Sequence, residues 1–119
     1  MDLIITPVSF YRTTAGNEPV REWLKSLSPQ DRKTLGNDLQ TIQLGWQTGL
    51  VCEPLVKSFG AGLFEMRTCL SSSQRIARVF FCIHERKIIL LHGFIKKTQK
   101  TPNAELELAK KRQKSLKNT

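Results

Sequence analysis

The spacing of apolar residues changes near Val51, and that change constrains the fold more than any other sequence feature. Over residues 18–49 apolar residues recur every three to four positions, as on one face of a helix. Over residues 51–97 they alternate or run continuously, as they do in strands. Helices first and strands afterwards predict an α+β fold, and 119 residues suit a single domain covering residues 1–119.

Two amphipathic helices are predicted in the first half. The first covers residues 18–27, with Pro19 in its first turn. The second follows Ser28, a suitable N-cap, and ends at Gly45 or Gly49. Their apolar stripes consist of Val20, Trp23, Leu24 and Leu27 in the first, and of Leu35, Leu39, Ile42 and Trp46 in the second. Such stripes pack most simply on a sheet.

The expected strands are short and form a meander. An apolar run at residues 3–7, closed by a proline, suggests a first strand at or near a sheet edge. Later strands are expected at 55–59, 63–70, 74–83 and 88–97, the last of them central because it is continuously apolar. The predicted architecture is a compact antiparallel sheet of about four strands with the two N-terminal helices packed on one face and a C-terminal basic helix.

That last helix begins at Thr101, a suitable N-cap, and Pro102. Its apolar face is weak, so we expect it to be either loosely docked or completed by a partner. It leads into a basic tail at about residues 110–119, which is typical of a solvated helix end but can also follow a nucleic-acid backbone.

The charge of the chain is uneven. Residues 1–50 hold five basic and five acidic residues, whereas residues 51–119 hold fourteen basic and five acidic ones, so the net charge of +9 lies entirely in the second half. This asymmetry indicates a nucleic acid, an anionic membrane or an acidic protein as the partner.

Several classes of protein and site are disfavoured. No cleavable leader or membrane-spanning segment is expected, so we expect a cytoplasmic protein without a membrane partner. Cys52, Cys69 and Cys82 form no C-x-x-C pair and lie among apolar neighbours, so buried reduced thiols are predicted. No spacing of ligand residues or glycines indicates a metal or another cofactor. His84 suits a turn, and His92 suits an interior, hydrogen-bonded position rather than the role of an acid or base.

One set of polar residues can carry chemistry if the strands pair as a meander. Glu65 and Arg67 share a face of one strand, and Arg78 of the next strand can join them. Lys57 lies nearby, and one of Lys96 and Lys97 can reach the same surface because regular alternation sends the other to the opposite face.

Cations around one carboxylate suit a phosphodiester. Metal-free RNA cleavage needs a base for the 2′-OH, cations for the phosphorane oxygens and an acid for the leaving 5′-oxygen. Glu65 could act as the base, Arg67 and Arg78 as the phosphate clamp, and a lysine as the acid or stabiliser. The alternative is a solvated strand face with a weak cross-strand ion pair.

Four motifs in this order resemble a known family: V-x-E-W-L, K-x-F-x-x-G-L-F-E-M-R, R-V-F-F and L-L-H-G-F-I-K-K-T-Q-K-T-P. Over residues 20–112 the chain resembles the phage-derived, HigB-like branch of the RelE/ParE toxin superfamily. The resemblance implies a RelE-like fold and the toxin of a type II toxin–antitoxin system that cleaves mRNA on the translating ribosome. It also implies a helix-turn-helix, HigA-like antitoxin as the partner, with the toxin a monomer or part of an antitoxin-bound hetero-oligomer.

The resemblance also implies site residues. Glu65, Arg67, Arg78, Lys96 and Lys97 are predicted to be catalytic, and Lys57, Arg75 and Lys100 to bind RNA. Several family ribonucleases use a histidine or tyrosine near the C-terminal end, whereas this chain has no tyrosine after Tyr11 and no histidine after His92. The identity of the base and acid stays open, as do two alternative functions: gyrase inhibition of the ParE type and an inactive, antitoxin-binding relic.

Overall fold

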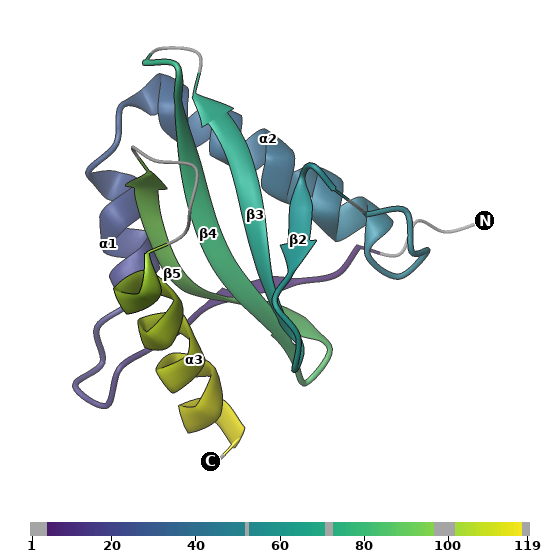
Figure 1. Cartoon of the computed structure of the whole chain (residues 1–119), viewed down its shortest axis with the longest axis vertical. Helices are drawn as coiled ribbons and strands as arrows, with labels where there is room; N and C mark the ends of the chain where they lie inside the picture. Colours follow the sequence, from purple (N-terminus) through teal and green to yellow (C-terminus); the bar gives the residue numbers. More distant parts are fainter. Residues whose placement is uncertain (1–4, 52, 71–72, 97–101, 118–119) are drawn as a thin grey trace.

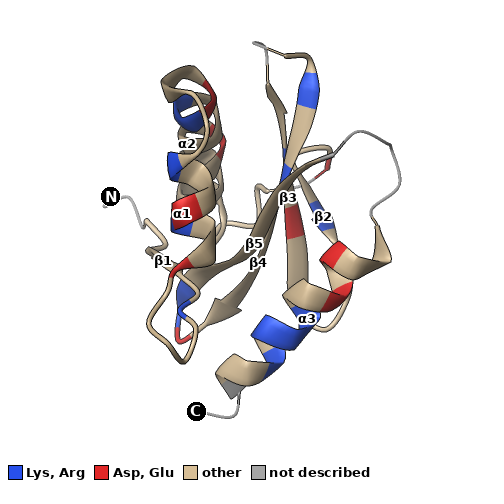
Figure 2. Cartoon of the chain, turned by 90° about the vertical axis from the view of Figure 1, so that its left-hand side faces the viewer, with Lys and Arg blue, Asp and Glu red and all other residues tan. Residues whose placement is uncertain are grey.

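One five-stranded sheet separates the helices into two layers, α1 and α2 on one face and α3 on the other (Figure 1 and Figure 2). The computed structural model describes residues 5–51, 53–70, 73–96 and 102–117. The elements are β1 (Val8–Phe10), α1 (Pro19–Lys25), α2 (Pro29–Gly45), β2 (Val56–Ser58), β3 (Leu63–Leu70), β4 (Arg75–His84), β5 (Lys87–Lys96) and α3 (Asn103–Lys117). The sheet order is β1-β5-β4-β3-β2, so the predicted α+β fold is confirmed.

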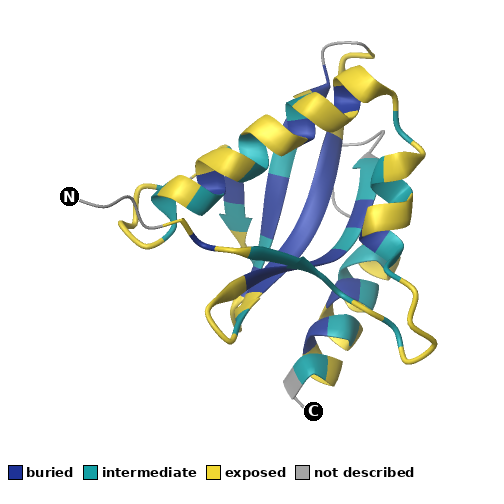
Figure 3. Cartoon of the chain, turned by 180° about the vertical axis from the view of Figure 1, so that it is seen from behind, coloured by how far each residue is buried: buried dark blue, intermediate teal, exposed yellow. Residues whose placement is uncertain are grey.

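The N-terminal helices form where the sequence predicts them. The Ser28 hydroxyl accepts a hydrogen bond from the Asp31 backbone N–H at 3.1 Å, which confirms the predicted cap of α2. The helix ends at Gly45. Leu35 and Ile42 of its apolar stripe are buried against the sheet, while the outward sides of both helices are exposed (Figure 3).

Strands β2 to β5 form the expected antiparallel meander, with β2 at an edge. Alternation along β3 is regular: Phe64 and Met66 pack in the layer of α1 and α2, while Leu63 packs on the α3 side. Glu65 and Arg67 lie at the same parity as Leu63, and this is the arrangement that the sequence predicts for this strand.

Alternation along β5 is interrupted by a bulge. Phe81 of β4 pairs with Leu90, but its neighbour Phe80 pairs with His92, so Leu91 is an extra residue. Beyond the bulge the parity of β5 is reversed, and Phe94 therefore packs on the α3 side of the sheet.

The same reversal turns Gly93 toward α1. A Cβ atom at this position would lie 2.5 Å from Cε3 of Trp23, so the indole occupies the space that a side chain would need. The glycine thus allows α1 to approach β5 closely.

The first strand lies later than predicted. Residues 5–7 form no strand, and β1 instead pairs with β5 in parallel, with Val8 opposite Ile88. The reason is that Pro7 has no N–H to donate to a strand neighbour. Its carbonyl accepts a hydrogen bond from the Ile88 N–H at 2.8 Å, and strand pairing starts only after it. The predicted edge position is correct, because β1 is outermost.

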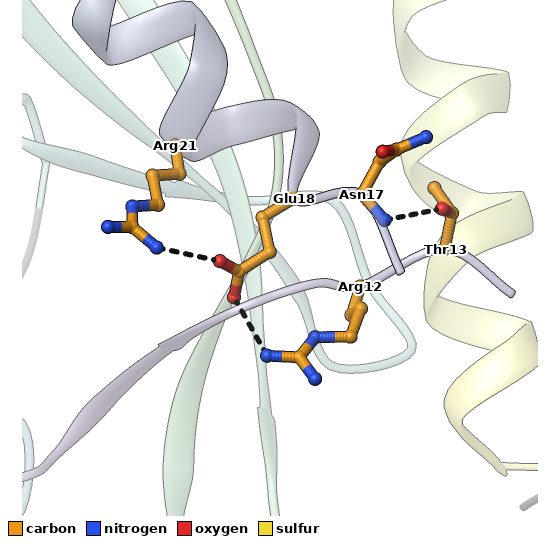
Figure 4. A network of polar contacts seen from close by, with 5 residues as sticks. All are labelled: Arg12, Thr13, Asn17, Glu18 and Arg21. Carbon is orange, nitrogen blue, oxygen red and sulfur yellow. Dashed lines mark hydrogen bonds and ion pairs between the residues drawn. The ribbon is translucent and has the colours of Figure 1, made fainter. Parts of the chain in front are cut away.

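A polar network fixes the connection from β1 to α1 (Figure 4). The Glu18 carboxylate lies 3.2 Å from Nη1 of Arg21 and 3.7 Å from Nη2 of Arg12. The Asn17 backbone N–H donates to the Thr13 hydroxyl at 3.1 Å. Both arginines are exposed, so these ion pairs orient the connection and contribute little to stability.

Helix α3 is docked on the sheet, which is the first of the two predicted possibilities. Ala109 is fully buried, and its small side chain lets the helix lie close to the strands. Nη1 of Arg112 donates to the Leu91 carbonyl at 2.7 Å, and the guanidinium carbon lies 5.4 Å from the centroid of the Tyr11 ring. Burial lowers the pKa of Arg112, and Tyr11 opposes that shift. Arginine stays protonated in proteins, so this anchor is cationic.

The prediction of buried thiols is correct for Cys82 and wrong for Cys69, which is exposed. Cys69 lies at the end of β3 that α3 does not cover, so apolar neighbours in the sequence do not enclose it. Cys52 lies outside the described residues. Among the helices that the structure describes, none is long and apolar enough to cross a membrane.

Candidate functional site

A buried carboxylate holds two guanidinium groups together on the α3 side of the sheet. Oε1 of Glu65 accepts from Nη1 of Arg78 at 2.8 Å and from Nε of Arg67 at 3.2 Å. Alternation on β3 places Glu65 and Arg67 on one face, and Arg67 is the register partner of Arg78 on β4. These three residues form what we call the guanidinium cluster, and the structure brings them together as the sequence predicts.

Burial increases from Arg67 inward through this cluster. The side chain of Arg67 is 27% exposed, that of Arg78 is 5% exposed, and that of Glu65 is fully buried. A buried carboxylate is tolerable only when cations and hydrogen-bond donors compensate for its lost hydration, and the two arginines do so. Glu65 therefore anchors the arginines, and its burial argues against the general-base role considered for it above.

The cluster has unused capacity for an anion. Two guanidinium groups and one carboxylate leave one positive charge in excess. Nε of Arg78 is buried and has no hydrogen-bond partner within the described part of the chain. A buried donor without an acceptor costs about 1–3 kcal/mol. An anionic ligand that reached this nitrogen would supply both the missing acceptor and the missing charge.

Aromatic rings lie beside the cluster. Phe94 of β5 is the register partner of Arg78, and its ring stacks on those of Phe80 and His92 with centroid distances of 6.0 Å and 5.6 Å. Phe59 contacts Phe80 from the other side at 5.5 Å. Rings next to guanidinium groups suit a ligand that has both phosphates and flat bases.

Part of this face is open. Helix α3 covers the rows of the sheet around Leu63 and Leu91, whereas Ile76 and Cys69, at the other end of the strands, are exposed. Arg67 lies on this uncovered side and is the most accessible member of the cluster. We call this surface the open end of the sheet.

The other predicted site residues differ in position. Lys57 of β2 is the register partner of Glu65, and its Nζ lies 5.3 Å from the centroid of the Phe59 ring, so it borders the cluster. Arg75 is exposed at the start of β4 and is three residues from Arg78, so it has the opposite parity and does not join the cluster. Lys96 pairs with Ile76 through its main chain, and its side chain is not described. Lys97 and Lys100 lie outside the described residues.

Sequence reasoning missed one polar pair in this region. Nε2 of His92 and Oε2 of Glu105 are 2.5 Å apart, joining β5 to the first turn of α3. The sequence indicates an interior histidine with a hydrogen bond, and the structure confirms the hydrogen bond of His92, whose side chain is partly buried. The sequence alone does not identify Glu105 as the partner of His92, because this contact depends on the bulge in β5 and on how α3 docks on the sheet.

The cluster shows no sign of a metal site. Among the residues that the structure describes, no three His, Cys, Asp or Glu side chains are grouped so that they could hold a metal ion. The chemistry that the cluster can perform itself is electrostatic: it can bind an anion and stabilise negative charge that develops on it.

One comparison with known proteins identifies a family. The family model described as "Phage derived protein Gp49-like (DUF891)" matches residues 22–114, more than three quarters of the chain. The matched segment contains the whole guanidinium cluster and the His92–Glu105 pair. No curated protein matches the chain.

Proposed function

Because the chain belongs to the Gp49-like family, a HigB-like toxin family of the RelE/ParE superfamily, we propose that it is a toxin that cleaves mRNA on the translating ribosome. Toxins of this family pair with HigA-like antitoxins. The partner of this chain is then a helix-turn-helix antitoxin that neutralises it in the cytoplasm.

The guanidinium cluster carries this proposal. Glu65 orients Arg67 and Arg78 toward one phosphodiester, and the excess positive charge and the unpaired Nε of Arg78 favour an anion there. A toxin that only bound another protein would not need a buried carboxylate that contacts two arginines. During cleavage the arginines stabilise charge on the phosphorane, which is usually the largest contribution to catalysis of this kind.

The remaining predicted residues extend this site. Lys57 contacts RNA beside the cluster, and the aromatic ring of Phe94 stacks on a base. Lys96, Lys97 and Lys100, which follow one another closely in the sequence, add cations that contact the RNA, and Arg75 contacts the RNA backbone outside the guanidinium cluster.

The test is expression without antitoxin, followed by primer extension on cellular mRNA. We expect growth arrest and cuts within translated regions. Arg67→Gln should abolish both, because it removes the accessible guanidinium while the buried Arg78–Glu65 pair remains. Arg21→Gln is the matched control, since it removes the same charge from α1 on the opposite face and should leave toxicity intact.

Two results would contradict the proposal. DNA breaks with intact mRNA would indicate gyrase inhibition instead. Full toxicity of Arg67→Gln, at the same protein level as the parent chain, would remove the guanidinium cluster from the mechanism.

A further inference from the structure

The cleavage proposed above needs a base, and the carboxylate nearest the phosphate-binding arginines is badly suited to that task. Glu65 has no exposed surface, and its Oε1 accepts hydrogen bonds from two guanidinium groups. Those two donors occupy the oxygen, and its complete burial keeps a ribose hydroxyl away from it. A base must also come within about 3 Å of the hydroxyl from which it takes a proton. A different group is needed.

His92 lies on the same face as the guanidinium cluster because of the bulge in β5. Its register partner is Phe80, two residues along β4 from Arg78. Cross-strand neighbours on one face are about 5 Å apart, and residues two apart along a strand about 7 Å. The imidazole is thus one row of side chains from the arginine that binds the phosphate in the proposed function, so it can face the sugar next to that phosphate.

The imidazole is held in a defined orientation. Nε2 of His92 contacts Oε2 of Glu105 at 2.5 Å, and the ring stacks on Phe94 with an angle of 21° between the planes. The His92 side chain is 16% exposed and that of Glu105 is 30% exposed, so both can be reached, unlike Glu65. With Nε2 donating to the carboxylate, Nδ1 keeps its lone pair and can accept a proton.

We propose that His92 is the general base of this toxin and that Glu105 is the residue that positions it, an inference that rests on the proposed RNA cleavage. Nδ1 takes the proton of the 2′-OH as O2′ forms a bond to phosphorus, and the bond from phosphorus to O5′ breaks. The products are a 2′,3′-cyclic phosphate and a 5′-OH. The 5′-oxygen takes its proton from water, and the imidazolium returns its proton to the solvent.

Other charged groups lie around the imidazole. Glu105 faces it from α3, and Arg78 and Glu65 of the guanidinium cluster lie on the neighbouring strands β4 and β3. The net charge of the cluster is positive, and Glu105 offsets it next to His92.

The experiment measures single-turnover cleavage of a defined mRNA on stalled ribosomes, together with ribosome binding, from pH 5 to pH 8. His92→Gln should lower the cleavage rate by about 10²–10⁴-fold, the usual contribution of a general base, and leave ribosome binding unchanged. Because a general base acts only in its unprotonated form, the rate of the parent chain should rise with pH, and His92→Gln should lose this rise. His84→Gln, which replaces the only other histidine, is the matched control and should behave as the parent chain.

Glu105→Gln keeps a hydrogen-bonding group opposite His92 but removes its charge. A positioning role predicts an intermediate loss of rate, about 10–100-fold, with the urea unfolding midpoint within error of the parent chain. If the pair only fastened α3 to the sheet, both variants would lower the midpoint and binding together and keep the pH dependence, which would overturn the inference.

The outcomes separate this inference from the proposed function. If the parent chain cleaves mRNA and His92→Gln cleaves at the same rate, the inference is wrong while the proposed function stands. If the parent chain cleaves no mRNA under any condition, both are wrong.

Discussion

Replacing Glu65 by glutamine gives a direct measure of what holds the guanidinium cluster together. The carboxylate is fully buried and contacts Arg78 at 2.8 Å and Arg67 at 3.2 Å, so the substitution leaves two cations without a counter-charge. Breaking a buried ion pair by removing one partner costs about 3–5 kcal/mol. The glutamine oxygen still accepts one hydrogen bond, so we expect a loss near the lower limit, about 3 kcal/mol.

Urea unfolding can resolve a change of this size. Small proteins lose about 1–3 kcal/mol of unfolding free energy per molar urea, so the unfolding midpoint of Glu65→Gln should fall by roughly 1–3 M. Arg78→Met should be similarly costly because it removes the closer of the two guanidinium groups from the buried Glu65 carboxylate. The variant that combines Glu65→Gln with Arg78→Met should lose about 1–3 kcal/mol less unfolding free energy than the two single losses added together, because both charges of this pair are then absent.

Additive losses of unfolding free energy would show that Glu65 and Arg78 do not stabilise each other. If the two single losses sum to the loss of the double variant within about 0.5 kcal/mol, the two side chains do not interact as the distance indicates. Glu22→Gln serves as the control, because this glutamate is exposed on α1 and pairs only at 3.9 Å with Lys25; its midpoint should not move.

Three further outcomes follow from the packing and charge. Gly93→Ala should destabilise the chain by about 1–3 kcal/mol in urea unfolding, because the new Cβ would overlap Trp23, whereas Gly36→Ala, on a helix with open space around it, should stabilise by about 1 kcal/mol. Ser28→Ala should cost about 1 kcal/mol through loss of the α2 cap, and an unchanged midpoint would contradict that role. In filter binding, RNA affinity should fall with salt, and Arg67→Gln should reduce the slope of log K against log salt by roughly 0.7, the loss of one phosphate contact; an unchanged slope would mean that Arg67 contacts no phosphate.

Local rules predict much of this fold. The cap at Ser28 and the alternation on β3 depend on residues a few positions apart, so the sequence contains all the information that they need. The same rule brings Glu65 and Arg67 to one face, and a meander with short turns aligns Arg78 with them. The guanidinium cluster therefore follows from the amino-acid sequence alone.

Features that depend on distant contacts were not predictable in this way. The position of β1 depends on a parallel pairing with a strand about eighty residues away, and its start is set by the hydrogen bond between Ile88 and Pro7. The exposure of Cys69 depends on where α3 ends its cover of the sheet. The weak apolar face of α3 left open whether the helix docks on the sheet, because polar anchors such as Arg112 add to the contacts of Ala109 and its apolar neighbours.

The bulge at Leu91 has a consequence for how related chains should be compared. A loss or gain of one residue between the β4–β5 turn and His92 would leave the letters H-G-F unchanged and send the histidine to the opposite layer. In two chains with the same motif, the histidine side chain can therefore lie on opposite faces of the sheet. The number of residues between the turn at Glu85 and Arg86 and the H-G-F motif tells the two arrangements apart. In a related chain that differs by one residue in this segment, the histidine of the motif cannot have the neighbours that His92 has here.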